Sequence, residues 1–340
     1  MILPSIAVLV GLALLYFGAE WLVRGGVAVG VQLRIPVVIV GLTVVSIGTS
    51  APELVVCVLA VLDGNSDLAV GNIMGSNLAN IGLILGLTAL VSPLGVARGV
   101  VRRDLPWMLA VTGVAFVLLL NEVIGRGEGL LLSALLLVYL GFLVRASRRG
   151  EALPVEGVPP VPNPTPAPKP GPERDLVRPG RGLLAGLGGR GVLLPVGLIV
   201  VGVLALAGGG RAVVMGATEL ALLFGVSQMV IGLSIVAIGT SLPELATTLV
   251  AAVRGQSDLA IGNIVGSNIF NLTFVLGGTA LVHPITVHPG VTSAELPALL
   301  AMSLLLVPFI ALGRNVTRWE GVLLLLAYLA AWGWMLPAVG

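Results

Sequence analysis

Residues 41–94 read GLTVVSIGTSAPELVVCVLAVLDGNSDLAVGNIMGSNLANIGLILGLTALVSPL, and residues 232–285 repeat this stretch at a constant offset of 191 without a gap. Thirty of the 54 aligned positions are identical. Both copies are long apolar runs that contain a few polar residues at the same places. Chance does not produce such a match, so the sequence predicts a duplicated architecture in which each half of the chain contains one copy of the same unit.

The composition of the 340-residue chain indicates an integral membrane protein. Hydrophobic residues make up 57% of the chain and charged residues 10%, whereas soluble domains carry about a quarter charged residues. About ten apolar stretches approach the roughly 20 residues that one bilayer crossing requires. These runs are continuous, unlike the alternating segments of a transmembrane β-barrel. The sequence therefore predicts an all-α polytopic membrane protein with about ten transmembrane helices and excludes a soluble globular protein.

The predicted spans form two groups of five. They are residues 2–22, 26–62, 67–91, 106–120 and 130–144 in the first group, and 191–207, 212–253, 258–282, 296–312 and 319–336 in the second. We expect residues 1–144 to form the first five-helix repeat, residues 145–190 a linker rich in proline and arginine, and residues 191–340 the second repeat. An odd number of spans per unit turns the second copy upside down, which predicts inverted repeats.

Basic residues predict the orientation of the chain in the membrane. With the N-terminus outside, the inner connections hold fifteen Lys and Arg residues and the outer connections hold two. The positive-inside rule then places both termini outside and the linker in the cytoplasm. We expect a multi-pass protein of the plasma membrane, with the lipid bilayer rather than nucleic acid as the partner of its basic charge and with no obligate protein partner.

Two polar motifs interrupt apolar stretches of more than 30 residues. Residues 48–53 read GTSAPE and residues 239–244 read GTSLPE. A carboxylate at bilayer depth costs about 2.5 to 3.5 kcal/mol on insertion scales, and Glu53 and Glu244 are the only acidic residues that we place so centrally. Because both occupy matched positions beside a proline, we interpret them as cation ligands rather than as a buried structural pair.

The prolines of these motifs predict a break in each span. Pro52 and Pro243 lack an N–H and clash with the carbonyl four residues earlier, so the carbonyls of Gly48 and Gly239 lose their helical partners and can face a polar cavity. Hydroxyl side chains lie three and four residues before each glutamate, near the same helical face; these are Thr49, Ser50, Thr240 and Ser241. Hydroxyl, carbonyl and carboxylate oxygens together form a site for a hard cation.

A second motif, GNIxGSNxxN, places polar residues at a spacing of four, which makes one polar stripe on a helix. The stripe consists of Asn72, Ser76 and Asn80 in the first copy, and of Asn263, Ser267 and Asn271 in the second. We interpret the serine and the last asparagine of each stripe as further ligands. For Asn72 and Asn263, hydrogen bonding between helices is an equally good interpretation. We expect Asp67 and Asp258 to cap helix N-termini.

At these residues the sequence resembles the cation/calcium exchanger superfamily, and specifically the prokaryotic type of its sodium/calcium exchanger branch. The two GTSxPE and the two GNIxGSNxxN segments look like the α-repeats of that family. The resemblance implies a secondary active antiporter that exchanges Na⁺ for Ca²⁺ by alternating access, with these two ions as substrates and without a cofactor. It also implies that Glu53 and Glu244 bind Ca²⁺ or, in its absence, Na⁺.

The resemblance further implies roles for the other motif residues. Thr49 and Thr240 would add backbone carbonyls to the calcium site, and Asn80 and Asn271 would complete its centre. Four serines would line the flanking sodium sites; these are Ser50, Ser241, Ser76 and Ser267. The proton-coupled branch usually has asparagine at the two threonine positions, which favours sodium as the coupling ion here.

Other functions remain open beside this one. A Ca²⁺/H⁺ exchanger of the same superfamily is the nearest alternative, and a passive cation channel could use the same broken helices. An intramembrane enzyme lacks a plausible nucleophile and base, because the single cysteine, Cys57, is best interpreted as a small buried residue and His283 and His288 belong to an outer loop. We therefore expect an ion antiporter and not an enzyme.

Overall fold

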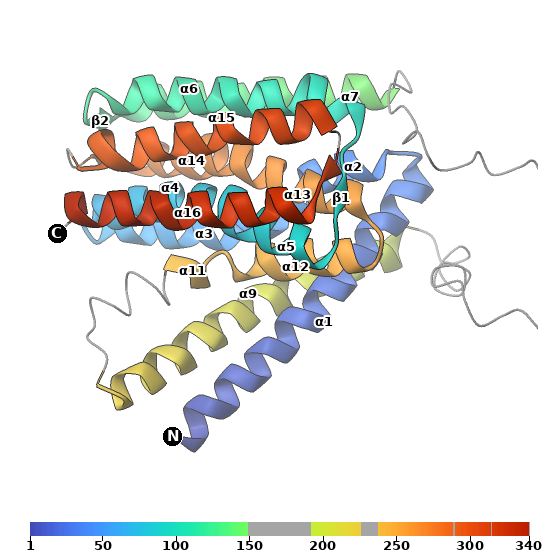
Figure 1. Cartoon of the computed structure of the whole chain (residues 1–340), viewed down its shortest axis with the longest axis horizontal. Coiled ribbons are helices and arrows are strands. Elements are labelled where there is room, and N and C mark those ends of the chain that lie inside the picture. Colours follow the sequence, from blue (N-terminus) through green and yellow to red (C-terminus); the bar gives the residue numbers. More distant parts are fainter. Residues whose placement is uncertain (149–191, 226–236, 288–289, 314, 340) are drawn as a thin grey trace, which may run out of the picture.

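The computed structural model describes residues 1–148, 192–225, 237–287, 290–313 and 315–339. Helices make up nearly all of these residues (Figure 1). Seven of the described helices are long and apolar enough to cross a membrane. The predicted fold class, an all-α polytopic membrane protein, is confirmed. The predicted linker lies outside the described residues except at its start, where the last helix of the first half continues to Arg148.

The elements of the first half follow one another with short connections. They are α1 (Ile2–Leu33), α2 (Val37–Val40), the π-helical turn η1 (Gly41–Val45), α3 (Ser46–Leu62), α4 (Ser66–Ala79), η2 (Asn80–Ile84), α5 (Leu85–Val91), β1 (Leu94–Gly95), η3 (Val100–Asp104), α6 (Leu105–Leu119), β2 (Val123–Ile124) and α7 (Arg126–Arg148). Because α2, η1 and α3 are continuous, as are α4, η2 and α5, each of these groups forms one long distorted helix.

The second half repeats this order. Its elements are α9 (Leu193–Leu223), α11 (Ala237–Gly239), α12 (Leu242–Val253), α13 (Ser257–Phe270), η5 (Asn271–Val275), α14 (Leu276–Val282), β3 (Ile285–Thr286), η6 (Val291–Glu295), α15 (Leu296–Gly313), β4 (Asn315–Val316) and α16 (Arg318–Val339). The π-helical turns η5 and η6 begin 191 residues after η2 and η3, so even these local distortions of the helices recur in the second copy.

The helices run between two ends of the molecule, each marked by a short antiparallel ribbon. We call the end where α7 ends and α9 begins the linker end, and the end where α1 begins and α16 ends the terminal end (Figure 1). At the linker end β1 pairs with β4, with Leu94 opposite Val316. At the terminal end β2 pairs with β3, with Val123 opposite Thr286. Each ribbon therefore joins a strand of one half to a strand of the other.

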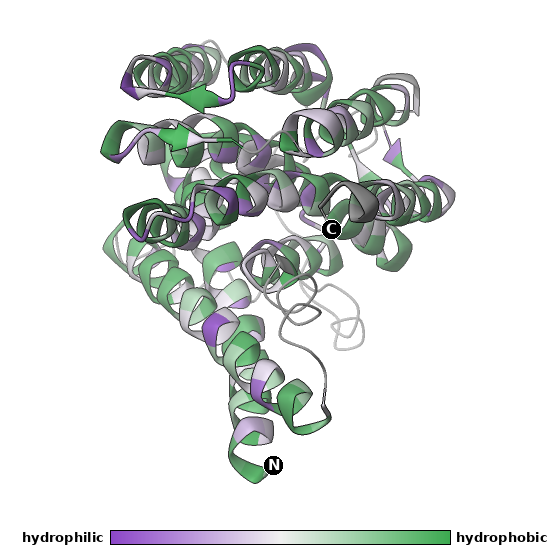
Figure 2. Ribbon diagram, turned by 90° about the vertical axis from the view of Figure 1, so that its left-hand side faces the viewer, coloured by the Kyte–Doolittle hydropathy of each residue, from purple (hydrophilic) through white to green (hydrophobic). Residues whose placement is uncertain are grey.

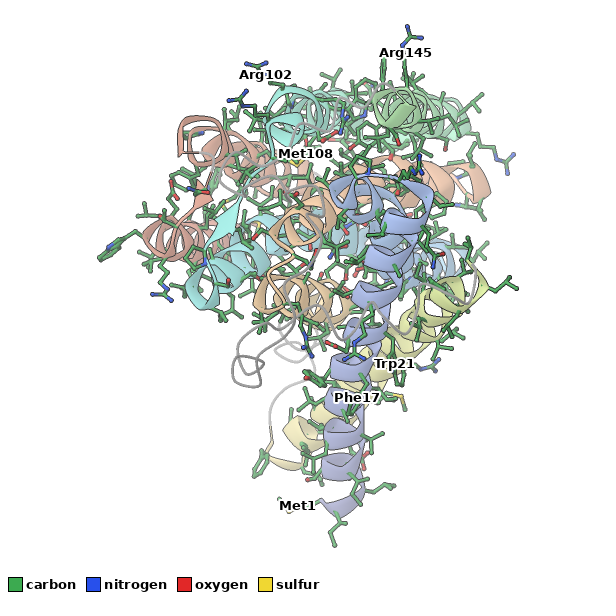
Figure 3. All side chains as sticks on the ribbon, turned by 90° about the vertical axis from the view of Figure 1, so that its right-hand side faces the viewer. Met1, Phe17, Trp21, Arg102, Met108 and Arg145 are labelled. Carbon is green, nitrogen blue, oxygen red and sulfur yellow. The ribbon has the colours of Figure 1, made fainter. Side chains whose placement is uncertain are left out.

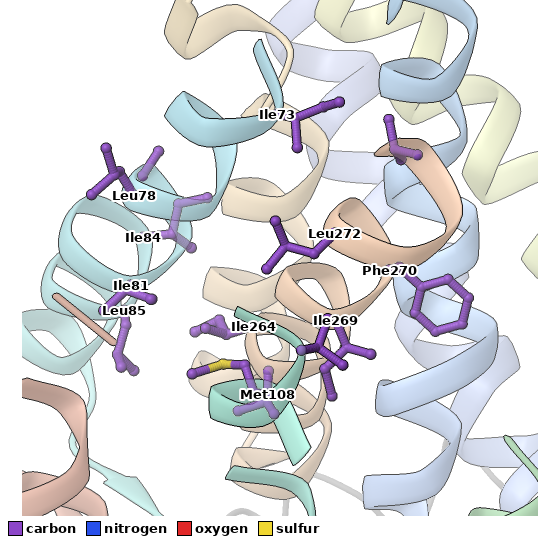
Figure 4. Packing of buried hydrophobic residues seen from close by; sticks show 14 of the residues in the cluster. Ile73, Leu78, Ile81, Ile84, Leu85, Met108, Ile264, Ile269, Phe270 and Leu272 are labelled. Carbon is purple, nitrogen blue, oxygen red and sulfur yellow. The ribbon is translucent and has the colours of Figure 1, made fainter. Parts of the chain in front are cut away.

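The two motif-bearing helices at the centre are the most buried part of the molecule. Of the apolar window in residues Ser257–Val282, 94% is buried, against 28% in the window of α1. Figure 4 shows side chains from both halves packed together there, including Ile73 and Leu78 with Ile264 and Leu272. Hydrophobic residues predominate along the helices, with hydrophilic stretches among them (Figure 2). The polar stripes of the sequence therefore lie in an apolar core, where unpaired polar groups are costly.

The helices α1 and α9 are longer than the sequence predicted. We expected breaks near Arg24 and Arg211, but both residues lie inside continuous helices. A seam of glycines explains why the two helices continue side by side. The seam consists of Gly11, Gly18 and Gly25 on α1, and of Gly202, Gly209 and Gly216 on α9. On each helix the seam glycines are seven residues apart, and each glycine of α9 stands 191 residues after one of α1.

The contacts at the glycine seam show how tightly the two helices pack. A Cβ atom at any of its six positions would lie 2.6–2.9 Å from an atom of the facing helix. Gly11 faces Gly209 and Val213, whereas Gly25 faces Pro195 and Ile199, so α1 and α9 are antiparallel. Small residues of this kind let helix backbones approach closely in membranes. The α1–α9 pair stands at an angle to the remaining helices (Figure 1).

The predicted break beside proline occurs in one copy only. In the second copy α11 ends at Gly239, a turn follows, and α12 begins at Leu242 with Pro243 in its first turn. In the first copy the prediction is wrong, because α3 continues through Pro52 without interruption. There the π-helical turn η1 precedes α3 directly, and the helix runs on through the proline. The two copies therefore have different conformations at the same motif.

The expected capping by aspartate is also wrong. The N-cap of α4 is Asn65, whose side-chain Oδ1 accepts a hydrogen bond from the N–H of Leu68 at 3.1 Å. Asp67 lies in the first turn instead. The N-cap of α13 is Gln256, and Asp258 likewise lies in the first turn. In that position a carboxylate still interacts favourably with the helix dipole.

Candidate ion-binding site

Glu53 and Glu244 lie at the centre of the molecule and approach one another. Glu53 is in the second turn of α3 and Glu244 in the first turn of α12, and each is 1% exposed. Their carboxyl groups are close enough to interact electrostatically. The structure therefore brings the two central acidic residues, one from each half of the chain, into one site.

Hydroxyl groups of the first copy reach the glutamate of the second. The Oγ of Ser50 donates a hydrogen bond to Oε1 of Glu244 at 3.4 Å. Thr49, also fully buried, lies beside the same carboxyl group. The Oγ1 of Thr49 is 3.5 Å from the Oγ of Ser267. Four predicted ligands, Thr49, Ser50, Glu244 and Ser267, are therefore connected across the two halves.

The remaining predicted ligands lie on the helices that border this centre. The turn η2, which begins at Asn80, packs against α12, and η5, which begins at Asn271, packs against α3. Each asparagine is thus on a helix that contacts the glutamate helix of the other half. Ser76 and Ser241 are buried as well. Thr240 is half-buried, and its hydroxyl is turned to Asn72 rather than to the carboxylates.

Many oxygen atoms around this centre have no hydrogen-bond partner within the described structure. They are both carboxylate oxygens of Glu53, Oε2 of Glu244, the hydroxyls of Ser76 and Ser241, and the side-chain oxygens of Asn80 and Asn271. Leaving one buried polar group unpaired costs about 1–3 kcal/mol, and such groups are rare in native proteins. Carboxylate, hydroxyl and amide oxygens gathered in this way match the ligand preferences of hard cations such as Ca²⁺.

Two other buried carboxylates, which the sequence analysis did not single out, differ from this pair. Glu20 in α1 forms ion pairs with Arg24 and Arg254. Asp104, which is fully buried, pairs with Arg103 and accepts a hydrogen bond from Tyr139 at 3.1 Å. No basic side chain of the described residues pairs with either central glutamate. Glu20 and Asp104 thus pair with arginines, whereas the two central glutamates lie among further oxygen atoms.

Hydrogen bonding between helices is confirmed for Asn72 and Asn263. The Oγ1 of Thr240 donates to Oδ1 of Asn72 at 3.0 Å, and the Oγ1 of Thr49 donates to Oδ1 of Asn263 at 3.3 Å. Each asparagine thus binds the threonine of the other half. Its amide then donates to a side chain of its own half, to Sγ of Cys57 at 3.4 Å or to Oγ1 of Thr248 at 3.0 Å.

The sequence analysis missed three further polar residues of this region. The amides of Asn77 and Asn268 donate to the carbonyl four residues earlier, and their Oδ1 atoms are buried without a partner. Both belong to the repeated GSN segment, so the repeat itself carried a signal for them. The Oγ1 of Thr247 is also buried and unpaired. The repeat gives no such signal for Thr247, because the matched residue of the first copy is Val56.

Comparison with known proteins gives one consistent result. The family model described as "Sodium/calcium exchanger protein" matches residues 4–145 and 194–336. The inner membrane protein YrbG of Escherichia coli is 38% identical over 307 residues, 90% of this chain and 88% of its own length. The sodium/calcium exchanger MaX1 of Methanosarcina acetivorans is 32% identical over 346 residues, 95% of each chain. A solved structure of the sodium-calcium exchanger NCX_Mj matches at a TM-score of 0.78 with 29% identity, and covers 98% of both chains.

Proposed function

The chain belongs to the sodium/calcium exchanger family, and on that premise we propose that it exchanges Na⁺ for Ca²⁺ around Glu53 and Glu244. Membership of this family supports a membrane transporter for cations and Ca²⁺. The identity of the counter-ion and the roles of single residues are our proposal. The observation that carries it is the pair of central carboxylates, which are buried together and have no basic partner in the described residues.

Charge balance supplies a physical reason for exchange. Two ionised glutamates are neutralised by one Ca²⁺ or by two Na⁺, and an uncompensated charge in a medium of low dielectric constant is very unfavourable. The protein with an empty site therefore resists the change that turns the site from one side of the membrane to the other. With either ion load bound, the protein can make this change. This penalty couples the outward flux of one ion to the inward flux of the other.

The burial of the serines and asparagines near the central glutamates supports the assignment of the other ligands. We propose that Ser50, Ser241, Ser76 and Ser267 bind Na⁺ beside the glutamates, and that Asn80 and Asn271 complete the centre. The hydroxyls of Thr49 and Thr240 are turned to Asn263 and Asn72. This supports a contribution to the calcium site through their backbone carbonyls, with the asparagines holding the two threonine side chains.

We propose ten spans in two inverted halves, residues 1–144 and 191–340, with a cytoplasmic linker between them and both termini outside. The antiparallel packing of α1 against α9 supports the inversion, since these helices begin the two halves. Exposed arginines at the linker end support the orientation by the positive-inside rule. Arg102 and Arg145 are two of them and project outward there (Figure 3).

Transport into proteoliposomes tests this proposal. Vesicles loaded with Na⁺ should take up Ca²⁺ when external Na⁺ is removed, and Glu53→Gln or Glu244→Gln should abolish the uptake. Glu219→Gln is the matched control, because Glu219 is exposed on α9. Equal uptake driven by a pH gradient without Na⁺ would reassign the protein to Ca²⁺/H⁺ exchange. Ca²⁺ flux down its own gradient without any counter-ion would indicate a channel.

A further inference from the structure

An ion-pair cluster ties α1 to α12 near the linker end. Glu20 of α1 is only 5% exposed. Its Oε2 accepts a hydrogen bond from Nε of Arg254 at 3.0 Å, and its Oε1 lies 2.9 Å from Nη2 of the same arginine. Arg254 is the C-cap of α12, the helix that carries Glu244 in its first turn. This two-point contact connects the α1–α9 pair to a helix of the ion-binding site.

The repeat places a second pair of opposite charges at the matched positions. At the offset of 191, Glu20 corresponds to Arg211 and Asp63 corresponds to Arg254. Both charges are reversed together, so one acidic and one basic residue again occupy the two matched positions. Arg211 is on α9, and Asp63 is the C-cap of α3, the helix that carries Glu53.

The two pairs are in different states. Asp63 and Arg211 are both exposed, and within the described residues no ion pair joins them. The Glu20–Arg254 pair, in contrast, is formed and its carboxylate is buried. The same asymmetry occurs at the polar motifs, where α3 is continuous through Pro52 whereas the second copy turns between α11 and α12. The two halves therefore hold different conformations of one repeated unit.

The glycine seam packs α1 and α9 into one unit. Six glycines hold the two backbones in contact along the length of both helices, so a shift of α1 relative to α12 must carry α9 with it. Because α9 also contacts α3, the same shift changes the position of Arg211 relative to Asp63. In inverted repeats, exchange of the two conformations between the halves produces the opposite-facing state.

We propose that Glu20–Arg254 and Asp63–Arg211 are alternating latches for the α1–α9 pair. In the described state Glu20–Arg254 is closed at the linker end. In the opposite-facing state that pair opens, and Asp63–Arg211 closes at the terminal end. The inference rests on the proposed antiport only in requiring two states, and not on which ions are carried. Opening the Glu20–Arg254 pair takes one of two arginine partners from the buried Glu20 carboxylate, which is unfavourable, so this latch holds the described state until ion binding shifts the balance.

Cross-linking of the open pair tests the inference. Asp63→Cys and Arg211→Cys are combined in a Cys57→Thr background, in which the cysteine takes the residue of the matched position, Thr248. The protein in proteoliposomes is treated with a bifunctional thiol reagent, and the cross-linked fraction is measured by gel mobility after proteolysis between the two positions. Addition of Glu20→Gln should raise the initial rate of cross-linking at least threefold, because it releases the closed latch. Arg254→Gln should give the same increase.

Arg24→Gln is the matched control, since it removes a charge that pairs with Glu20 inside α1 and leaves the contact with α12 in place. It should leave the rate of cross-linking unchanged. The inference is wrong if Glu20→Gln and Arg254→Gln leave the rate unchanged. It is also wrong if the two cysteines never cross-link although each reacts with a monofunctional reagent. Cross-linking does not depend on ion identity, so loss of Na⁺/Ca²⁺ exchange alone would contradict the proposed function and not the latches.

Discussion

The hydroxyl of Ser50, in the first half of the chain, donates a hydrogen bond to the carboxylate of Glu244, in the second half, with 3.4 Å between Oγ and Oε1. This contact crosses between the two copies of one motif. It means that the two copies build one shared site instead of two independent ones. A change in either half therefore alters the same site.

Removal of the Ser50 hydroxyl should weaken ion binding without abolishing transport. Ser50→Ala leaves Oε1 of Glu244 without this donor and removes one oxygen from the site. We expect a several-fold increase in the Na⁺ concentration that gives half-maximal exchange, measured as Ca²⁺ efflux against external Na⁺. Ser241→Ala at the matched position in the second copy should shift the same curve. Unchanged Na⁺ dependence in both variants would exclude the serines as ligands.

The two asparagines that bind threonine should differ in their effect on stability. Asn263→Ala leaves the buried hydroxyl of Thr248 without its donor, at about 1–3 kcal/mol for an unpaired buried group, and removes one of the partners of Thr49. Asn72 is half-buried, and one of its partners is the sulfur of Cys57, which is a weak hydrogen-bonding group. Asn263→Ala should therefore lower the thermal unfolding temperature in detergent more than Asn72→Ala does. The reverse order would contradict the hydrogen bonds described here.

Neighbouring glycines on α9 provide a matched test of the glycine seam. A Cβ at Gly209 would lie 2.8 Å from the carbonyl oxygen of Gly11, whereas a Cβ at Gly208 would meet nothing within 4 Å. Gly209→Ala should destabilise the protein, because the two backbones must separate. Gly208→Ala should be neutral or stabilise it by up to about 1 kcal/mol, the usual gain in a helix. Thermal unfolding compares the two, and equal effects would show that α1 and α9 are not in contact at Gly209.

Much of this arrangement was predictable from the repeat and from the placement of polar residues. Composition and apolar runs predicted the fold class, and the identical GTSxPE motifs singled out Glu53 and Glu244, which the structure brings together. A carboxylate in an apolar run is costly, which is why this signal is strong. The identical polar stripes likewise indicated Asn80 and Asn271, whose helices border the site.

The errors have physical reasons. We predicted helix ends near Arg24 and Arg211, because a charged residue beside glycines is typical of a connection between two spans. Both residues lie inside continuous helices, since the glycines serve the packing of α1 against α9. The break at Pro52 was wrong because α3 continues through the proline, which membrane-spanning helices tolerate where neighbouring groups satisfy the freed backbone. Glu20 was overlooked because its partner Arg254 is distant in the sequence. The continuous helices α1 and α9 and the Glu20–Arg254 pair depend on contacts between the two halves, which no local pattern encodes.

Calcium titration calorimetry on the purified protein tests directly whether Glu53 and Glu244 form the Ca²⁺ site. We expect Ca²⁺ to bind to the wild-type protein and excess Na⁺ to displace it. Glu53→Gln and Glu244→Gln should each abolish the binding heat, while Glu219→Gln should preserve it. If Ca²⁺ still binds with unchanged affinity in both central variants, the Ca²⁺ site is not built around these two glutamates.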